Sequence, residues 1–302
     1  MEEINDIIHR CRWSESIKEF FDFANLPLID IIDIKKEKFE NFEEKDKYSN
    51  ILHLKETNTD VEILNIANYE NFQPISLYYT ILICMSINFP QLRKLTGVYF
   101  SELDNYHTST NAKIGLAFKH YDGLNLLNYV LHGERKKISD KLICELLIKL
   151  VKIVVSLHNV NIPIYFCLGP KNIIVTKRKN LVLTNYHHLY MTYIIGNTWS
   201  DELNYFPPEA LYTENSDGTC KYDIWFLGAI MVHLFSGIIP WKNVEIESFV
   251  ELLKNTPTDI YKNFDKNHKA FPLIHNCCRK GAEDRCSSKQ LLEDLLKLCE
   301  LL

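Results

Sequence analysis

The chain has 302 residues, of which 46% are hydrophobic and 24% are charged, a composition typical of a soluble globular protein with one large domain or two lobes. The formal net charge of -5 excludes the basic surface that a nucleic-acid-binding protein needs to neutralise phosphates, so we expect no nucleic-acid partner. The nine cysteines lack paired spacing, which argues against a disulfide framework.

The beginning of the chain does not resemble a secretory signal. Residues Met1–Asp6 are acidic, whereas a signal peptide starts with basic and then apolar residues. No apolar run reaches the roughly 20 residues that a membrane span requires. We therefore expect a cytoplasmic protein that does not insert into membranes.

Residues 1–28 are predicted to form an accessory helical segment. Apolar residues such as Ile4, Ile8 and Cys11 recur at helical spacing, and Pro27 closes the segment.

Short strands are predicted beyond residue 29. Runs of β-branched and aromatic residues bounded by polar turn residues are typical of strands. Two of these runs are separated by Thr57–Asp60, which supply hairpin chemistry. The predicted strands are Ile51–Lys55, Val61–Ile66, Leu95–Phe100 and Lys113–Phe118, with a helix around Ile75–Met85.

Helices dominate the sequence from Asn125 onward. Between Leu142 and Leu157, apolar residues recur every three or four positions and are interrupted by charges such as Glu145 and Lys149, which indicates an amphipathic helix. The chain is therefore predicted to be an α+β protein. Its β-rich N-lobe is placed at about 29–119 and its helical C-lobe at about 120–302.

Four segments, in order, resemble the sequence motifs of protein kinases. They correspond to the catalytic loop, the end of the activation segment, the central helix with its exit, and the closing motif. The segments are Leu157-His158 with Leu168–Val175, Tyr205–Glu209, Asp223–Gly228 with Gly237–Trp241, and Cys278–Leu291. This resemblance implies a bilobal protein kinase fold over residues 29–302.

The kinase resemblance assigns structural roles to four polar residues. Glu209 and Arg285 are expected to form a buried ion pair. Asp223, near the start of a helix, is expected to accept hydrogen bonds from the backbone of the loop that it supports. Asn172 is expected to tie that loop through hydrogen bonds.

The positions that carry phosphoryl transfer in kinases hold unsuitable residues here. That chemistry needs a catalytic carboxylate, a magnesium-binding carboxylate, a lysine paired with a glutamate, and a glycine-rich loop over the phosphates. The corresponding residues are Cys167, Asn185, Leu64 and Thr80, and no glycine precedes Gly97. We therefore predict a pseudokinase, not an enzyme, that binds neither nucleotide nor another cofactor.

The resemblance also places Phe118 at the gatekeeper position and Lys119 and His120 in the hinge. Phe118 and Leu64 are then expected to fill the nucleotide cleft with apolar side chains. The same two side chains would also stabilise the fold as part of its core. Cys167 is interpreted as a structural cysteine because no base is identified beside it.

No metal site is predicted. The histidine and cysteines nearest to such a pattern are His275, Cys277, Cys278 and Cys286, and they lack the ligand spacing of a zinc site.

Within kinases the sequence is tyrosine-kinase-like and is most similar to the pseudokinase domain of the mixed lineage kinase domain-like proteins, the effectors of necroptosis. Three features carry this similarity: Ile32–Phe39 ahead of the first strand, the polar insertion Ser101–Ala112, and Asn172–Thr176 leading to the degenerate magnesium site. That family has a four-helix bundle before its pseudokinase domain, for which residues 1–28 leave no room. The resemblance therefore implies a poxvirus-encoded homologue in the host cell cytoplasm.

Such a homologue is expected to bind the host receptor-interacting protein kinase and so to inhibit necroptosis as a decoy. Its partner surface is expected around the activation segment, at about Leu189–Phe206. The candidate residues there are Tyr190, Thr192, Tyr193, Thr198, Trp199 and Ser200; the hydroxyls of Thr192, Thr198 and Ser200 are candidate phosphorylation sites.

Two other functions remain open from the sequence. The first is a pseudokinase scaffold or allosteric regulator of another kinase, in a protist or a host pathway. The second is an atypical enzyme that uses the cleft for other chemistry, and it requires nucleotide binding despite Leu64 and the missing glycines.

Overall fold

The computed structural model describes residues 31–33, 39–44, 49–54, 59–65, 89–100, 114–131, 138–164, 168–184, 203–207, 209, 220–241 and 259–302. The predicted accessory segment at 1–28 and the predicted helix around Ile75–Met85 lie outside these residues. The described residues form two compact units, one up to Tyr121 and one from Asp122 onward. The predicted lobe boundary at 119–120 lies two residues before this division.

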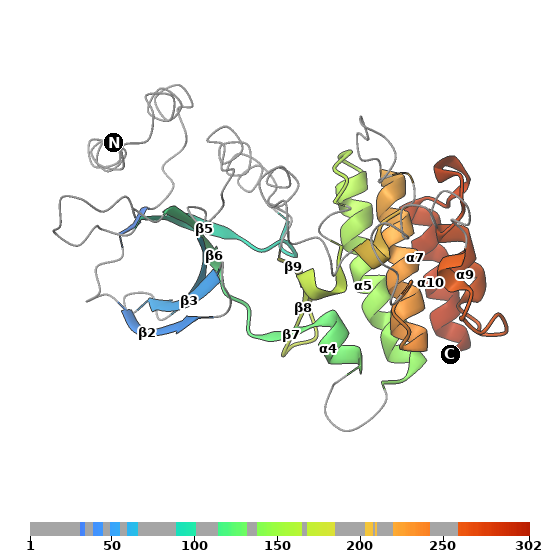
Figure 1. Cartoon of the computed structure of the whole chain (residues 1–302), viewed down its shortest axis with the longest axis horizontal. Helices are drawn as coiled ribbons and strands as arrows, with labels where there is room; N and C mark the ends of the chain where they lie inside the picture. The colour runs from blue at the N-terminus through green and yellow to red at the C-terminus, as the bar shows by residue number, and fades with distance from the viewer. Residues whose placement is uncertain are drawn as a thin grey trace. The chain divides into compact units, whose positions relative to one another are not determined.

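The first unit is built on a six-stranded sheet (Figure 1). Its strands are β1 (Ile31–Asp33), β2 (Phe39–Glu44), β3 (Ser49–Leu54), β4 (Thr59–Asn65), β5 (Leu95–Phe100) and β6 (Ile114–Lys119). The order across the sheet is β1-β5-β6-β4-β3-β2, and all neighbours are antiparallel except β1 and β5. The four predicted strands are therefore present, and β1 and β2 are additional.

Two details of the prediction were wrong. Thr59 and Asp60 were assigned to a hairpin turn, but they pair with Leu54 and His53 as part of β4. Residues 32–39 were placed ahead of the first strand, but Ile31–Asp33 already pair in parallel with Val98–Phe100.

Strand β4 lies in the interior of the sheet, between β3 and β6. Val61, Glu62 and Ile63 are all buried, although successive side chains of a strand point to opposite faces. Glu62 pairs with Phe118 of β6, so these two side chains share one face.

The second unit combines a small sheet with a group of helices. Its antiparallel strands are β7 (Gly123–Asn125), β8 (Ile173–Thr176) and β9 (Leu181–Leu183), in the order β7-β8-β9. Its α-helices are α4 (Leu126–Leu131), α5 (Asp140–His158), α7 (Cys220–Ser236), α9 (Phe271–Cys277) and α10 (Ser288–Leu301). The α+β class that the sequence predicts is thus confirmed.

Side-chain caps explain where the two longer outer helices begin. The hydroxyl of Ser139 accepts the backbone N–H of Leu142 at the start of α5, and the hydroxyl of Ser287 accepts that of Gln290 at the start of α10. The apolar stripe of α5 is wider than predicted, because Cys144, Ile148 and Ile153 are also buried, whereas Leu142 at its start is only half-buried.

Helix α7 is the centre of the second unit. Every residue from Tyr222 to Phe235 is buried, so this helix has no solvent face, which is typical of a core helix. It packs against α5 and α9, while α10 packs against α5. The central position of α7 lets its few polar side chains act on several elements at once.

Gly228 provides the close approach of α7 to α9. A Cβ atom there would lie 2.4 Å from Sγ of Cys278 and 2.8 Å from Cβ of Cys277, and both cysteines are fully buried. We expect Gly228→Ala to cost about 1–3 kcal/mol of unfolding free energy through overpacking, measured by urea denaturation.

Gly281→Ala is the matched control for this substitution. Its Cβ would meet only the exposed carboxylate of Asp284, at 2.6 Å, and that side chain has room to move. Equal stability of the two alanine variants would contradict the close packing of α7 on α9.

Candidate functional site

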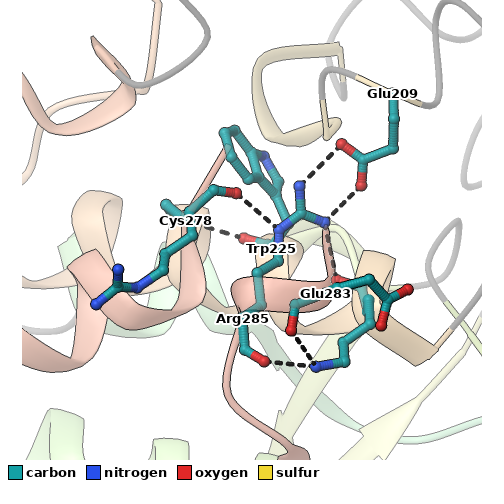
Figure 2. Close-up of polar contacts among 7 residues, drawn as sticks. Glu209, Trp225, Cys278, Glu283 and Arg285 are labelled. Atoms are coloured by element: carbon teal, nitrogen blue, oxygen red, sulfur yellow. Dashed lines mark hydrogen bonds and ion pairs between the residues drawn. The ribbon is translucent and has the colours of Figure 1, made fainter. Parts of the chain in front are cut away.

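Arg285 is the centre of a buried polar cluster in the second unit (Figure 2). Its Nη1 and Nη2 donate to Oε1 and Oε2 of Glu209 at 2.5 and 2.8 Å. Its Nε donates to the carbonyl of Arg279 at 3.0 Å, and Nη1 also donates to the carbonyl of Lys221 at 3.1 Å. The guanidinium also lies 4.8 Å from the ring centre of Trp225, which adds a cation–π contact.

The burial of this cluster means that the ion pair is stable only if its charges are well compensated. The Arg285 side chain is fully buried, and that of Glu209 is 24% exposed. A charge removed from water is tolerated only when hydrogen bonds and an opposite charge surround it. The cluster therefore fixes Glu209 to the segment between α9 and α10.

Lys221 also belongs to this cluster. Nζ of Lys221, in the first turn of α7, donates to the carbonyl of Arg285 at 2.5 Å and lies 3.4 Å from the carbonyl of Glu283. Lys221 and Arg285 thus donate to each other's backbone carbonyl, which anchors the start of α7.

Asp223 is a second buried anchor on α7. Its carboxylate accepts the backbone N–H of Ile164 at 3.0 and 3.2 Å and Nε2–H of His158 at 2.7 Å. Nδ1 of His158 is hydrogen-bonded to the hydroxyl of Ser288 at 3.0 Å. Burial raises the pKa of Asp223, and the hydrogen bonds from His158 and Ile164 act against this rise. One carboxylate thus connects α7, α5 and the loop that follows α5, and His158 extends the connection to α10.

Asn172 lies in a buried 3-10 turn at Pro170–Asn172, just before β8. Its N–H donates to the carbonyl of Gly169 at 2.8 Å, and its own carbonyl accepts the N–H and the hydroxyl of Thr184 at 2.9 and 3.0 Å. The backbone of Asn172 therefore ties this loop to the residue that precedes Asn185.

The degenerate catalytic positions are only partly described. The backbone of Leu64 lies in β4, paired with Leu116 of β6. Thr80, Cys167 and Asn185 lie outside the described residues. The candidate partner residues also lie outside them: Tyr190, Thr192, Tyr193, Thr198, Trp199 and Ser200.

Sequence reasoning missed a buried ion pair in the first unit. Nη2 of Arg93 lies 2.9 Å from Oε2 of Glu62, and the two side chains are 5% and 10% exposed. Nε of Arg93 donates to the carbonyl of Lys119 at 3.3 Å, and its guanidinium lies 4.9 Å from the ring centre of Phe118. Nδ1 of His120 lies 3.6 Å from the same Glu62 oxygen. The signal in the sequence that could have indicated this pair was a glutamate between two apolar residues, Val61 and Ile63, in a predicted strand.

A buried histidine lies at the end of α7. His233 is 2% exposed, and its Nδ1 is 2.5 Å from the hydroxyl of Tyr205. Burial lowers the pKa of His233 from 6.5 to about 4, so the folded protein holds this ring neutral.

The pKa of His233 predicts a pH-dependent stability. The unfolded chain binds a proton more readily than the folded chain between pH 6.5 and about 4, so the free energy of unfolding rises with pH across this window. The stability that depends on a neutral His233 ring is fully present above pH 6.5 and is lost as the pH falls toward about 4. The free energy of unfolding is measured by urea denaturation at several pH values. We expect it to change less with pH in His233→Phe than in the wild type. Identical slopes would contradict a neutral buried ring.

Among the residues that the structure describes, no three His, Cys, Asp or Glu side chains are grouped to hold a metal ion. Within the same residues, no helix is both long and apolar enough to cross a membrane.

The sheet of the first unit, the helices around α7 and the two buried anchors define a protein kinase fold of the α+β class. Residues 47–296 match the protein kinase domain family, and the chain belongs to this family. A segment of 89 residues is 27% identical to the probable cell cycle serine/threonine-protein kinase CDC5 homolog of Encephalitozoon cuniculi (strain GB-M1). This match covers 30% of the present chain and 19% of that protein, so it spans about a fifth of the relative's length.

Proposed function

We propose that this chain is a catalytically inactive member of the protein kinase family that acts by binding another protein. The proposal is supported by the residues that stand at the positions which the kinase resemblance assigns to phosphate binding. No glycine precedes Gly97, and the kinase resemblance assigns Leu64, in β4, to the position of the phosphate-binding lysine. A backbone that closes over phosphates needs residues without Cβ, and a leucine offers them no charge.

The retained scaffold supports the same proposal. The second unit keeps the Arg285–Glu209 pair and the Asp223 anchor, which serve the fold and do not touch phosphate. A chain that keeps these structural groups, and has Leu64, Cys167 and Asn185 at the positions that the resemblance assigns to catalytic groups, is suited to bind a partner through its surface.

Nucleotide binding provides the first test. Thermal unfolding is measured with and without ATP and Mg²⁺, and an active protein kinase serves as the positive control. A ligand at 100 times its dissociation constant would add about 2.7 kcal/mol to the stability. We expect no such shift, and a saturable shift together with phosphate transfer to a peptide would overturn the proposal.

The finer proposal is that the partner is a host receptor-interacting protein kinase and that the chain is a viral decoy that inhibits necroptosis. Its support is the similarity of Ile32–Phe39, Ser101–Ala112 and Asn172–Thr176 to the mixed lineage kinase domain-like proteins. The partner surface is proposed at about Leu189–Phe206, but its last two residues, Tyr205 and Phe206, are buried in the second unit and are not part of it.

Affinity purification from mammalian cells competent for necroptosis tests the decoy. We expect the tagged chain to recover a receptor-interacting kinase and to suppress cell death. A variant with Tyr190, Tyr193 and Trp199 changed to alanine should do neither, provided that its unfolding curve matches the wild type. Purification without that kinase, and without protection from death, would refute the decoy.

A second candidate is a scaffold or allosteric regulator of a different kinase. Its support is the similarity of an 89-residue segment to a probable cell cycle serine/threonine-protein kinase. The activity of a co-purified kinase separates the two proposals: a regulator raises or lowers that activity at a fixed concentration of kinase, whereas a decoy acts by competing with the cellular effector.

A further inference from the structure

We propose that Arg93, held by Glu62, takes the place of the purine ring in the first unit, so that the chain supplies its own occupant for the nucleotide position. This inference rests on the proposed loss of nucleotide binding and gives it a second cause, independent of the missing phosphate groups. The four residues that form the plug are Glu62, Arg93, Phe118 and Lys119.

The first step is the place of the ion pair in the sheet. Glu62 stands one residue after Val61 in β4 and opposite Phe118 in β6, so both side chains lie on one face. The kinase resemblance assigns Phe118 to the gatekeeper position and Lys119 to the hinge. The face that carries Glu62 is therefore the face against which a nucleotide base would pack.

The second step is the chemistry of the guanidinium. It is a flat cation with N–H donors along its edge, and it lies over the Phe118 ring with 4.9 Å to the ring centre. Its Nε–H donates to the carbonyl of Lys119 at 3.3 Å. A purine base also presents a flat ring and an exocyclic amine that donates to a carbonyl, so the side chain of Arg93 satisfies the same partners.

The third step is the cost of removing Arg93 from this place. Both side chains of the pair are nearly excluded from water, and His120 also faces the Glu62 carboxylate, at 3.6 Å. Withdrawal of Arg93 would leave a buried carboxylate without its principal counter-charge, which is strongly unfavourable. The plug is therefore a permanent part of the first unit, and a ligand does not readily displace it.

The test opens the plug and asks whether a base binds. Glu62→Ala with Arg93→Val removes both charges, and replacing a buried ion pair with apolar residues is often neutral or stabilising. Adenosine is the probe, because it needs no phosphate-binding group. We expect isothermal titration calorimetry to show saturable adenosine binding to the double variant and none to the wild type.

A matched control removes a hydrogen-bonded side-chain pair elsewhere in the same sheet. Nδ1 of His53 and Oδ1 of Asp60 are 2.7 Å apart on β3 and β4, and Asp60 is exposed. The variant His53→Ala with Asp60→Ala should behave like the wild type toward adenosine. If the valine variant does not fold, Glu62→Gln with Arg93→Ala opens the same place and keeps a polar group for His120.

The outcomes separate this inference from the proposed function. A folded double variant that does not bind adenosine overturns the plug and leaves the inactive protein in place. Adenosine binding by the wild type also overturns the plug, and phosphate transfer by the wild type overturns the proposed function. Adenosine binding by the Glu62 and Arg93 double variant, without binding by the wild type, supports both the plug and the proposed inactive protein.

Discussion

Replacing Arg285 with alanine is expected to cost about 3–5 kcal/mol of unfolding free energy, the usual loss when one partner of a buried ion pair is removed. The substitution leaves the Glu209 carboxylate without its two N–H donors and the carbonyls of Arg279 and Lys221 without theirs. It also removes the cation that packs on Trp225.

Urea denaturation of three variants measures this effect. Arg285→Lys is expected to lose less than Arg285→Ala, because an ammonium keeps the charge but not the paired N–H donors. Arg279→Ala is the control, because the Arg279 side chain is exposed and donates to the side-chain oxygen of Asn276 at 3.2 Å. A loss below about 1 kcal/mol for Arg285→Ala would place the pair among ordinary surface salt bridges.

Replacing Asp223 with alanine is expected to have the second large effect, a loss of about 3 kcal/mol or more, because hydrogen bonds to a charged group contribute about 1.5–3 kcal/mol each. The backbone N–H of Ile164 and Nε2–H of His158 both lose their acceptor. The N–H of Ile164 is buried, so its unpaired state adds a desolvation cost.

A double-mutant cycle with Asp223→Asn and His158→Gln isolates the side-chain contact. Residues that share one hydrogen-bond network show coupling of about 0.5–3 kcal/mol, and we expect a value in this range. If the Ile164 amide exchanges its hydrogen more slowly in the wild type than in Asp223→Asn, the loss of stability includes the loop that follows α5. Additive losses in the cycle would show that His158 and Asp223 do not act together.

Features carried by local patterns were predictable from the sequence. Strands β3 to β6 follow from β-branched runs, and α5 follows from its apolar periodicity. The Arg285–Glu209 pair was predictable although the two residues are 76 positions apart, because each belongs to a recognisable motif.

Contacts that depend on long-range pairing without a motif were missed. Strand β1 has only three residues and pairs in parallel with a strand more than sixty positions away, so no alternation marks it. Glu62 and Arg93 come from separate segments, and charged residues are usually exposed, so neither charge by itself indicated a buried pair. The partners of His158 likewise required α7 and α10 to be placed beside α5.

The parallel strand β1 also affects how another protein can attach to the chain. Open sheet edges expose unpaired N–H and C=O groups, and a second polypeptide can extend the sheet by pairing with them. In the described sheet one edge of β5 is already covered by Ile31–Asp33, and β2 is the strand at the opposite edge. A partner that recruits this protein by strand addition would therefore pair with Phe39–Glu44, or with the outer edge of the three-residue strand Ile31–Asp33, and would reach β5 only by displacing that strand.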